Sequence, residues 1–178
     1  MTRFATLLLI ILVTGCVSQP VGLHTPAEIL GTASHWSMKG KLGLRSPEEN
    51  LSLGVWWSQA GDVYEIDFRG AMAMGSGRIT GDPARGIRLE ANGDKPVYGQ
   101  TPEQLVERLT GVSVPVTPMK YWVRGRPSPE SPYESAADGF RQMGWLVETT
   151  LDPRGLPKRI ILTREAVRLK LVVKSWGY

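Results

Sequence analysis

The residues that could carry covalent or acid–base chemistry are few in this chain. Cys16 is the sole cysteine, so an intramolecular disulfide is excluded. The two histidines, His24 and His35, are far from any plausible Cys or Ser partner, and no residues at metal-ligand spacing accompany them. Glu48 and Glu49 are neighbours on a polar turn, where carboxylates are normally solvated. We therefore expect no catalysis, no bound metal and no cofactor.

The residues before Cys16 indicate lipid attachment. The chain opens with Arg3, an apolar run over residues 4–13 and small residues up to the cysteine, which is the layout of a secretory signal peptide. The run is about half as long as the roughly 20 residues that a membrane-spanning helix needs. The tetrapeptide VTGC resembles the bacterial lipobox, which implies that Cys16 receives a diacylglyceryl group. An ordinary signal peptide with an incidental cysteine is the alternative.

This interpretation divides the chain into a signal peptide over residues 1–15, a lipidated tether over 16–26 and one domain over 27–178. Acyl chains, at about 0.8 kcal/mol per buried CH₂, would hold such a protein on a membrane. Val17 follows the cysteine, where an Asp would be the usual inner-membrane retention signal. We therefore expect a lipid-anchored protein of the outer membrane that faces the periplasm.

The charge and the composition restrict the partners. The formal net charge is +4, and Lys and Arg are spread among acids without a basic block, so nucleic acid is not an expected partner. The chain has 13 prolines and 20 glycines without a repeat, which favours many turns and short strands. We expect a monomer.

Alternating apolar and polar residues predict an antiparallel sheet along most of the domain. In residues 63–69, for example, Tyr64, Ile66 and Phe68 fall on one face, and charged residues fall on the other. The predicted strands cover residues 36–44, 51–58, 63–69, 76–80, 86–91, 140–150, 157–163 and 167–176.

Helices are the only predicted cover for the apolar face of this sheet. A Thr-Pro pair opens each of three segments, which we expect to be helical over residues 27–34, 101–111 and 117–125. Residues 126–135 are predicted to be a proline-rich loop. A curved sheet with such partial cover tends to leave a cavity.

The motifs follow the order found in the LolB family of outer-membrane lipoprotein receptors, which the chain resembles over nearly its whole length. They include WSMKGKLGL, YEIDF running into GAMAMG, LTG before PV, YWVRGRP, QMGW and LPKRI. The most specific of them are YWVRG at 121–125 and QMGW at 142–145.

The resemblance implies a mainly β fold, an unclosed antiparallel β-barrel capped by short helices around an apolar cavity. It also implies that the cavity takes acyl chains of lipoproteins from the periplasmic carrier LolA and delivers them to outer-membrane lipids, with no chemistry on the cargo. Inward-facing residues are the candidates for its lining, namely Leu53, Val55, Trp57, Ile66, Phe68, Trp122, Trp145, Leu146, Leu169 and Leu171.

The apolar turn AMAM, between two predicted strands, is the candidate membrane-insertion loop. In the family a protruding Pro-Leu-Gly turn carries an exposed apolar residue, and the resemblance places Met72 there, with Ala71 and Ala73 beside it. Met74 is a second candidate for the role. The alternative is that both methionines fold back to plug the open end of the sheet.

Two other functions share the lipobox and the sheet. One is a membrane-anchored structural or scaffolding lipoprotein with a filled interior, and the other is a carrier of a free lipid. For a receptor, an acidic carrier rim would suit basic residues such as Lys39, Lys41 and Arg69, although each can equally be an ordinary solvated charge.

Overall fold

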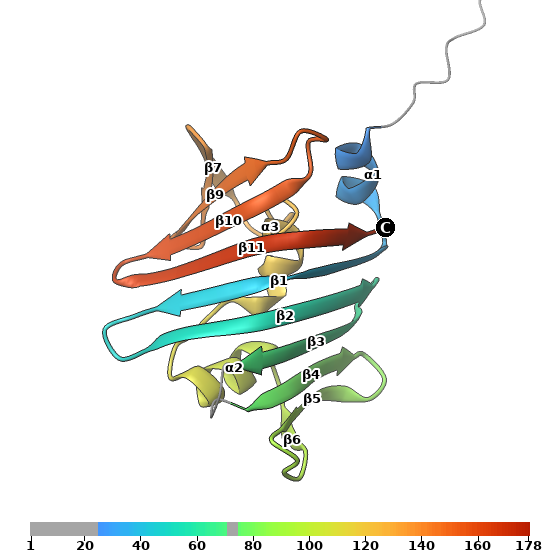
Figure 1. Ribbon diagram of the computed structural model, residues 1–178, viewed down its shortest axis with the longest axis vertical. Helices are drawn as coiled ribbons and strands as arrows, with labels where there is room; N and C mark the ends of the chain where they lie inside the picture. Colours follow the sequence, from blue (N-terminus) through green and yellow to red (C-terminus); the bar gives the residue numbers. More distant parts are fainter. Residues whose placement is uncertain (1–24, 71–74) are drawn as a thin grey trace, which may run out of the picture.

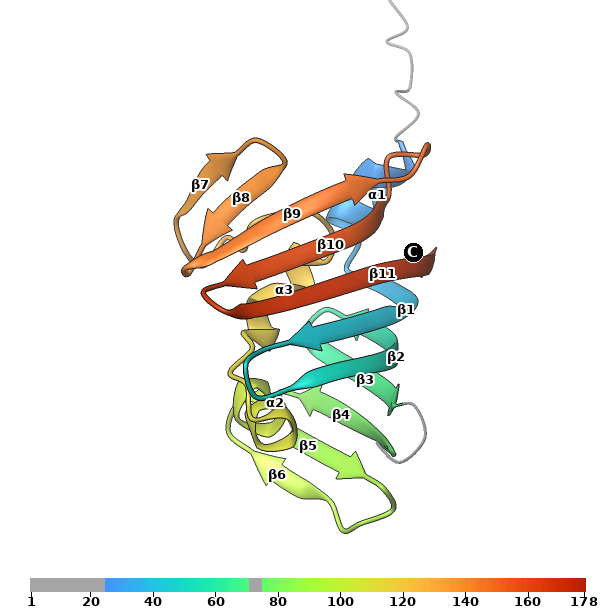
Figure 2. The same ribbon diagram turned by 60° about the vertical axis from the view of Figure 1, so that its left-hand side comes forward.

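The computed structural model describes residues 25–70 and 75–178, and in this part of the chain all strands join one sheet. The eleven strands are antiparallel, in the order β6-β5-β4-β3-β2-β1-β11-β10-β9-β8-β7. Every neighbouring pair is consecutive in sequence except β1 and β11, which bring the two ends of the domain together in mid-sheet (Figure 1). Because β6 and β7 stand at opposite edges, the curved sheet is an unclosed half-barrel (Figure 2).

The elements have the following bounds. The strands are β1 (His35–Arg45), β2 (Asn50–Ala60), β3 (Val63–Gly70), β4 (Ser76–Asp82), β5 (Gly86–Ala91), β6 (Val97–Gly99), β7 (Tyr133–Ala136), β8 (Gly139–Gln142), β9 (Trp145–Leu151), β10 (Pro157–Arg164) and β11 (Val167–Gly177). The helices are α1 (Pro26–Thr32), α2 (Pro102–Thr110) and α3 (Val116–Trp122).

The two helices with threonine caps begin where the sequence predicts. The Thr25 side chain accepts a hydrogen bond from the Glu28 backbone N–H, and the Glu28 carboxylate accepts one from the Thr25 backbone N–H at 2.7 Å. The Thr101 hydroxyl caps α2 in the same way, and Gly111 ends that helix in the left-handed conformation at φ 68°. The third helix, α3, starts at Val116, has no side-chain cap and ends before the predicted residue 125.

The edge of the sheet differs from the prediction. Residues 140–150 form two strands instead of one, because Met143 and Gly144, at φ 52° and 77°, make a tight turn between β8 and β9. The predicted loop 126–135 contains the start of β7, and β6 was not predicted. These strands have three or four residues each, too few for an alternating pattern to show.

The two faces of the sheet have opposite character, as predicted. In β11, Leu169 and Leu171 are buried, whereas Arg168 and Lys170, which alternate with them, are exposed. The helices lie over the apolar, concave face (Figure 2).

Two separate clusters of buried side chains form on this concave face. The main one gathers side chains from β1, β2, β8–β11 and the helices α1 and α3. The second consists of Ile79, Leu89 and Leu105, between α2 and strands β4 and β5.

Candidate functional site

An apolar pocket of about 270 Å³ lies on the concave face, below α2 and α3. Seven of the predicted cavity residues lie along it, from strands β2, β3 and β11, namely Leu53, Val55, Trp57, Ile66, Phe68, Leu169 and Leu171. They meet there because the inward positions of paired antiparallel strands stand opposite one another, as Leu42 does to both Leu53 and Leu171.

Three other predicted lining residues do not line this pocket. Trp122 and Trp145 are fully buried in the main core, and Leu146 is half-buried on β9. The Trp122 indole N–H donates to Gln142 Oε1 at 2.7 Å, which holds α3 against β8. An inward-facing position has the same sequence pattern in a filled core as in a pocket, so the pattern did not separate them.

The helices supply a wall of the pocket that the sequence interpretation missed. Val106 and Leu109 of α2 and Val116 and Met119 of α3 line it, together with Val123 just beyond α3. Leu109 is 41% exposed, which is unusual for a leucine at helical spacing from the buried Leu105. The apolar residues 105, 106 and 109 of the predicted helix were the signal that could have found this wall.

The pocket lies at the seam between the two core clusters. Ile66 packs against both of them, as does Val106. Ile79 of the second cluster and Leu169 of the main one both line the pocket. The side chains of neither cluster fill the space between them, and this leaves apolar surface without a partner.

The walls of this pocket contain no acid, base or nucleophile poised to react. Among the described lining residues the one hydroxyl is that of Thr110, and it donates to the Val106 carbonyl oxygen at 2.9 Å. The Trp57 indole N–H donates to Gln59 Oε1 at 3.0 Å. The pocket can therefore offer contact to apolar material and little else.

One unusual polar group stands beside the pocket. The Tyr64 hydroxyl is buried and has no hydrogen-bond partner among the described residues. Burial, followed by the negative charge of Glu103, raises the pKa of Tyr64 to about 12. The Tyr64 ring packs against Gly81 of β4, where a Cβ would overlap the ring.

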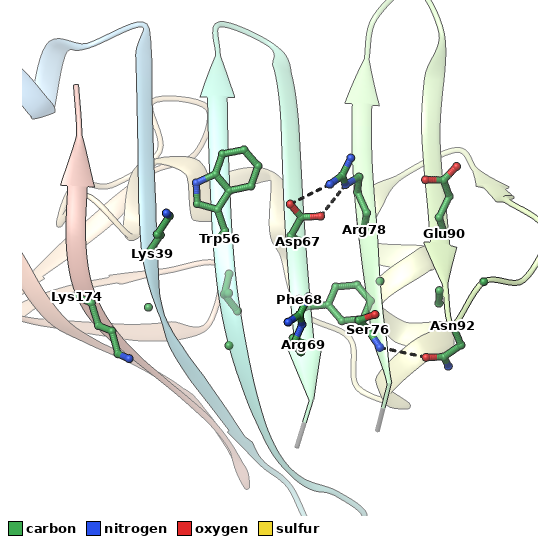
Figure 3. Close-up of a pocket in the computed structure, with 16 residues that line it drawn as sticks. Lys39, Trp56, Asp67, Phe68, Arg69, Ser76, Arg78, Glu90, Asn92 and Lys174 are labelled. Atoms are coloured by element: carbon green, nitrogen blue, oxygen red, sulfur yellow. Dashed lines mark hydrogen bonds and ion pairs between the residues drawn. The ribbon is translucent and has the colours of Figure 1, made fainter. Parts of the chain in front are cut away.

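A second hollow, of about 670 Å³, lies on the outer face of the sheet (Figure 3). It is open to solvent, and both charged and apolar residues line it. Arg78 Nε donates to Asp67 Oδ1 at 2.6 Å, and this hydrogen bond raises the pKa of Arg78. Lys39, Trp56 and Lys174 line the hollow on the side toward the centre of the sheet (Figure 3).

The predicted lipidation site and insertion loop lie outside the described residues. This applies to Cys16 and to Ala71, Met72, Ala73 and Met74. The ends of the loop are described, and the Gly70 backbone N–H donates to the Gly75 carbonyl oxygen at 2.9 Å. The loop therefore begins and ends between paired strands, β3 and β4.

The remaining chemistry-bearing residues are not brought together. His35 Nδ1 lies 3.0 Å from the Ser34 hydroxyl, and Glu48 accepts a hydrogen bond from Ser46. Within residues 25–70 and 75–178, no three His, Cys, Asp or Glu side chains are close enough to hold a metal ion. Over the same residues no helix has the length and apolar character needed to cross a bilayer.

The fold and the pocket together define a helix-capped half-barrel with an apolar pocket on its concave face. Comparison with known proteins gives the family. The chain belongs to the LolB family, because the family model described as "Outer membrane lipoprotein LolB" matches residues 34–176.

Curated relatives agree with this assignment. The chain is 34% identical to the outer-membrane lipoprotein LolB of Chromohalobacter salexigens, over 96% of this chain and 87% of the relative. The protein of the same name from Cellvibrio japonicus is 31% identical over 91% of this chain and 89% of its own length. The one from Pseudomonas fluorescens is 33% identical over 87% and 83%.

Proposed function

We propose that this chain is an outer-membrane receptor that accepts acylated lipoproteins from the periplasmic carrier LolA and inserts them into the outer membrane. Membership of the LolB family supports a role in lipoprotein localisation. The observation that carries the finer proposal is the apolar pocket on the concave face, whose walls suit acyl chains and have no group that could react with them.

The pocket favours acyl chains over other ligands for a physical reason. An acyl chain gains about 0.8 kcal/mol for each CH₂ that it buries, and it needs no hydrogen-bond partner. The half-buried Leu53, Val55 and Ile66 offer such contact on the sheet side, and Leu109 offers it on the helix side. A polar or charged ligand would lose hydration there without compensation.

The pocket must widen to hold a full cargo. Its volume of about 270 Å³ lies just below the range for small-molecule pockets, roughly 300–1,000 Å³. Helix α2 is the wall suited to move, since Leu105 anchors it in a cluster of only three buried residues. An outward shift of α2 would move Val106 and Leu109 away from the sheet and enlarge the pocket.

The direction of transfer follows from relative affinities. Without ATP, acyl chains must bind this pocket more favourably than the carrier, and the membrane more favourably than this pocket. A difference of about 1.4 kcal/mol at each step gives a tenfold bias. Lipidation of Cys16 would keep the domain at the membrane, and Met72, with Met74 beside it, would enter the lipid when cargo is released.

A pair of leucine variants tests the pocket. Leu109→Glu places a carboxylate in its helical wall, whereas Leu151→Glu changes a leucine that is 55% exposed at the end of β9, outside the pocket. Both positions are exposed enough to accept Glu without unfolding the domain. Displacement of a bound apolar dye by acylated lipoprotein measures cargo affinity.

We expect Leu109→Glu to weaken cargo binding about tenfold or more, because a leucine that bound cargo covers fully contributes about 1.5–3 kcal/mol. Leu151→Glu should bind like the unchanged protein. Equal binding by both variants would refute the assignment of this pocket to acyl chains. A scaffolding lipoprotein would show no displacement of the dye in any variant.

A further inference from the structure

Six basic side chains lie in two adjacent strands at the middle of the sheet, on its outer face. They are Lys39, Lys41 and Arg45 of β1 and Arg168, Lys170 and Lys174 of β11, and all six are exposed. The register places Arg45 opposite Arg168 and Gly43 opposite Lys170. We call these six residues the basic strip. It runs along β1 and β11, which lie side by side in the middle of the sheet (Figure 1).

The basic strip is not neutralised by the protein itself. Within the described part of the chain, none of the six forms an ion pair. The acids that β3 and β5 carry on the outer face have partners of their own. Arg78 pairs with Asp67 and with Glu65, and Arg88 lies 3.5 Å from Glu90. Like charges on paired strands repel one another. The strip therefore carries a positive electrostatic potential that no acid of the described residues neutralises by an ion pair.

An aromatic side chain flanks the strip. Trp56 of β2 stands opposite Lys39 and is half-buried, so part of its indole remains accessible beside the lysine (Figure 3). An amphipathic indole next to lysines is typical of surfaces that lie at the headgroup level of a membrane. The flanking hollow on the outer face contains Lys39, Lys174 and Trp56 together.

We propose that the basic strip rests on the anionic headgroups of the membrane to which the protein is anchored. The inference relies on the proposed function only for the lipid anchor at Cys16. Helix α1 begins at Pro26 and leads directly into β1, so the tether joins the domain at one end of the strip. Ten extended residues reach roughly 35 Å, about the length of an eleven-residue strand.

The tether therefore keeps the strip within reach of the bilayer at all times. A soluble acidic protein would have to reach the strip by diffusion, so the membrane is the favoured partner. In this orientation the outer face lies on the headgroups, and the concave face with its pocket points into the periplasm. The pocket is then accessible to a soluble donor of cargo.

Chemical labelling of lysines in the full, lipidated chain tests the orientation. The protein is inserted through its anchor into vesicles of phosphatidylethanolamine with phosphatidylglycerol, or of phosphatidylcholine alone. An amine-reactive ester then modifies accessible lysines, and mass spectrometry gives a rate for each. Lys39, Lys41, Lys170 and Lys174 report on the strip, and the exposed Lys95, between β5 and β6, is the internal control.

We expect the four strip lysines to react at least about threefold more slowly on the anionic vesicles, with Lys95 unchanged. The protection should vanish in 1 M salt, where the Debye length is about 3 Å. Equal rates on both vesicles would overturn the proposal. Protection that arises only after an acidic soluble carrier is added would assign the strip to a protein partner instead.

A charge-reversal pair provides the second test. With Lys41→Glu and Lys170→Glu combined, Lys39 and Lys174 should lose their protection on anionic vesicles. Lys95→Glu combined with Arg85→Glu changes the net charge equally at exposed sites off the strip and should preserve it. Persistent protection in the strip variant would contradict the proposal.

The comparison of vesicles needs neither cargo nor carrier, and the carrier enters only as a separate addition, so failure of the vesicle comparison is distinct from failure of the proposed receptor function. If fatty-acid labelling finds Cys16 unmodified, the same vesicles added to the free protein still test the strip. If vesicles with phosphatidylglycerol do not slow the labelling of the strip lysines in the free protein, the proposal is also overturned.

Discussion

At the scale of single residues, Tyr64 couples the pocket region to pH. Its hydroxyl is buried without a partner among the described residues, and its pKa is raised to about 12 from an ordinary value near 10. Below pH 10 the side chain is protonated in both the folded and the unfolded chain. Between about pH 10 and 12 the unfolded chain loses the proton while the folded chain keeps it, so the free energy of unfolding must fall as the pH rises.

We therefore predict that Tyr64→Phe flattens this loss of stability between pH 10 and 12. At neutral pH the variant should unfold within about 1 kcal/mol of the unchanged protein, because no hydrogen bond is removed. Urea unfolding at a series of pH values measures both effects. Tyr98→Phe, at a tyrosine that is 65% exposed, is the control and should keep the full pH dependence. An equally steep fall in Tyr64→Phe would show that other groups cause it.

At the scale of elements, the contact between β1 and β11 depends on a glycine. The register shifts between Lys39 and Gly40, and this irregularity brings the backbones close together. A Cβ on Gly40 would stand 2.6 Å from the Val172 carbonyl oxygen, closer than real Cβ contacts. At Gly43, farther along the same strand, the nearest atoms are carbonyl oxygens at 3.9 Å.

Gly40→Ala should accordingly lower the free energy of unfolding by about 1–3 kcal/mol, the usual cost of overpacking. Gly43→Ala should leave it unchanged or raise it slightly, because alanine loses less backbone entropy than glycine in a strand. Tryptophan fluorescence during urea unfolding distinguishes the two variants. Equal free energies of unfolding for the two variants would mean that β1 and β11 can move apart at Gly40 without loss of stability.

Elements with a long alternating pattern could be predicted from the sequence, and short ones could not. The pattern in residues 167–176 is long enough to fix both the strand and its buried face, and β11 confirms it. The turn at Met143 was missed because a methionine with positive φ has no sequence signal, although the following Gly144 allows the turn. Strands β6 and β7 owe their existence to their neighbours in the sheet, which local sequence does not record.

The same distinction applies to the candidate site. The faces of β2, β3 and β11 followed from alternation, so their pocket residues could be predicted. Trp122 has the same apolar character but a partner in Gln142, and this buried pair fills the core where a cavity was expected. The contribution of Leu109 depends on how α2 packs across the sheet, a tertiary contact that the sequence pattern does not specify.

At the scale of the whole molecule, delivery to the membrane is predicted to depend on the loop between β3 and β4. Met72→Glu should leave uptake of cargo unchanged and slow its release into liposomes severalfold, since a carboxylate enters hydrocarbon poorly. Met143→Glu, at a methionine that is 54% exposed in the β8–β9 turn, is the matched control and should release cargo normally. Normal release by Met72→Glu would transfer the role to Met74 or remove it from the loop.

Acceptance of cargo from the carrier is the central claim, and transfer between the two proteins tests it most directly. The protein is mixed with LolA loaded with a radiolabelled lipoprotein, without ATP, and a pull-down then shows which protein holds the label. The account predicts that most of the label moves to this protein, and that Leu109→Glu accepts less of it than Leu151→Glu. Label that stays on the carrier in every mixture would contradict the account.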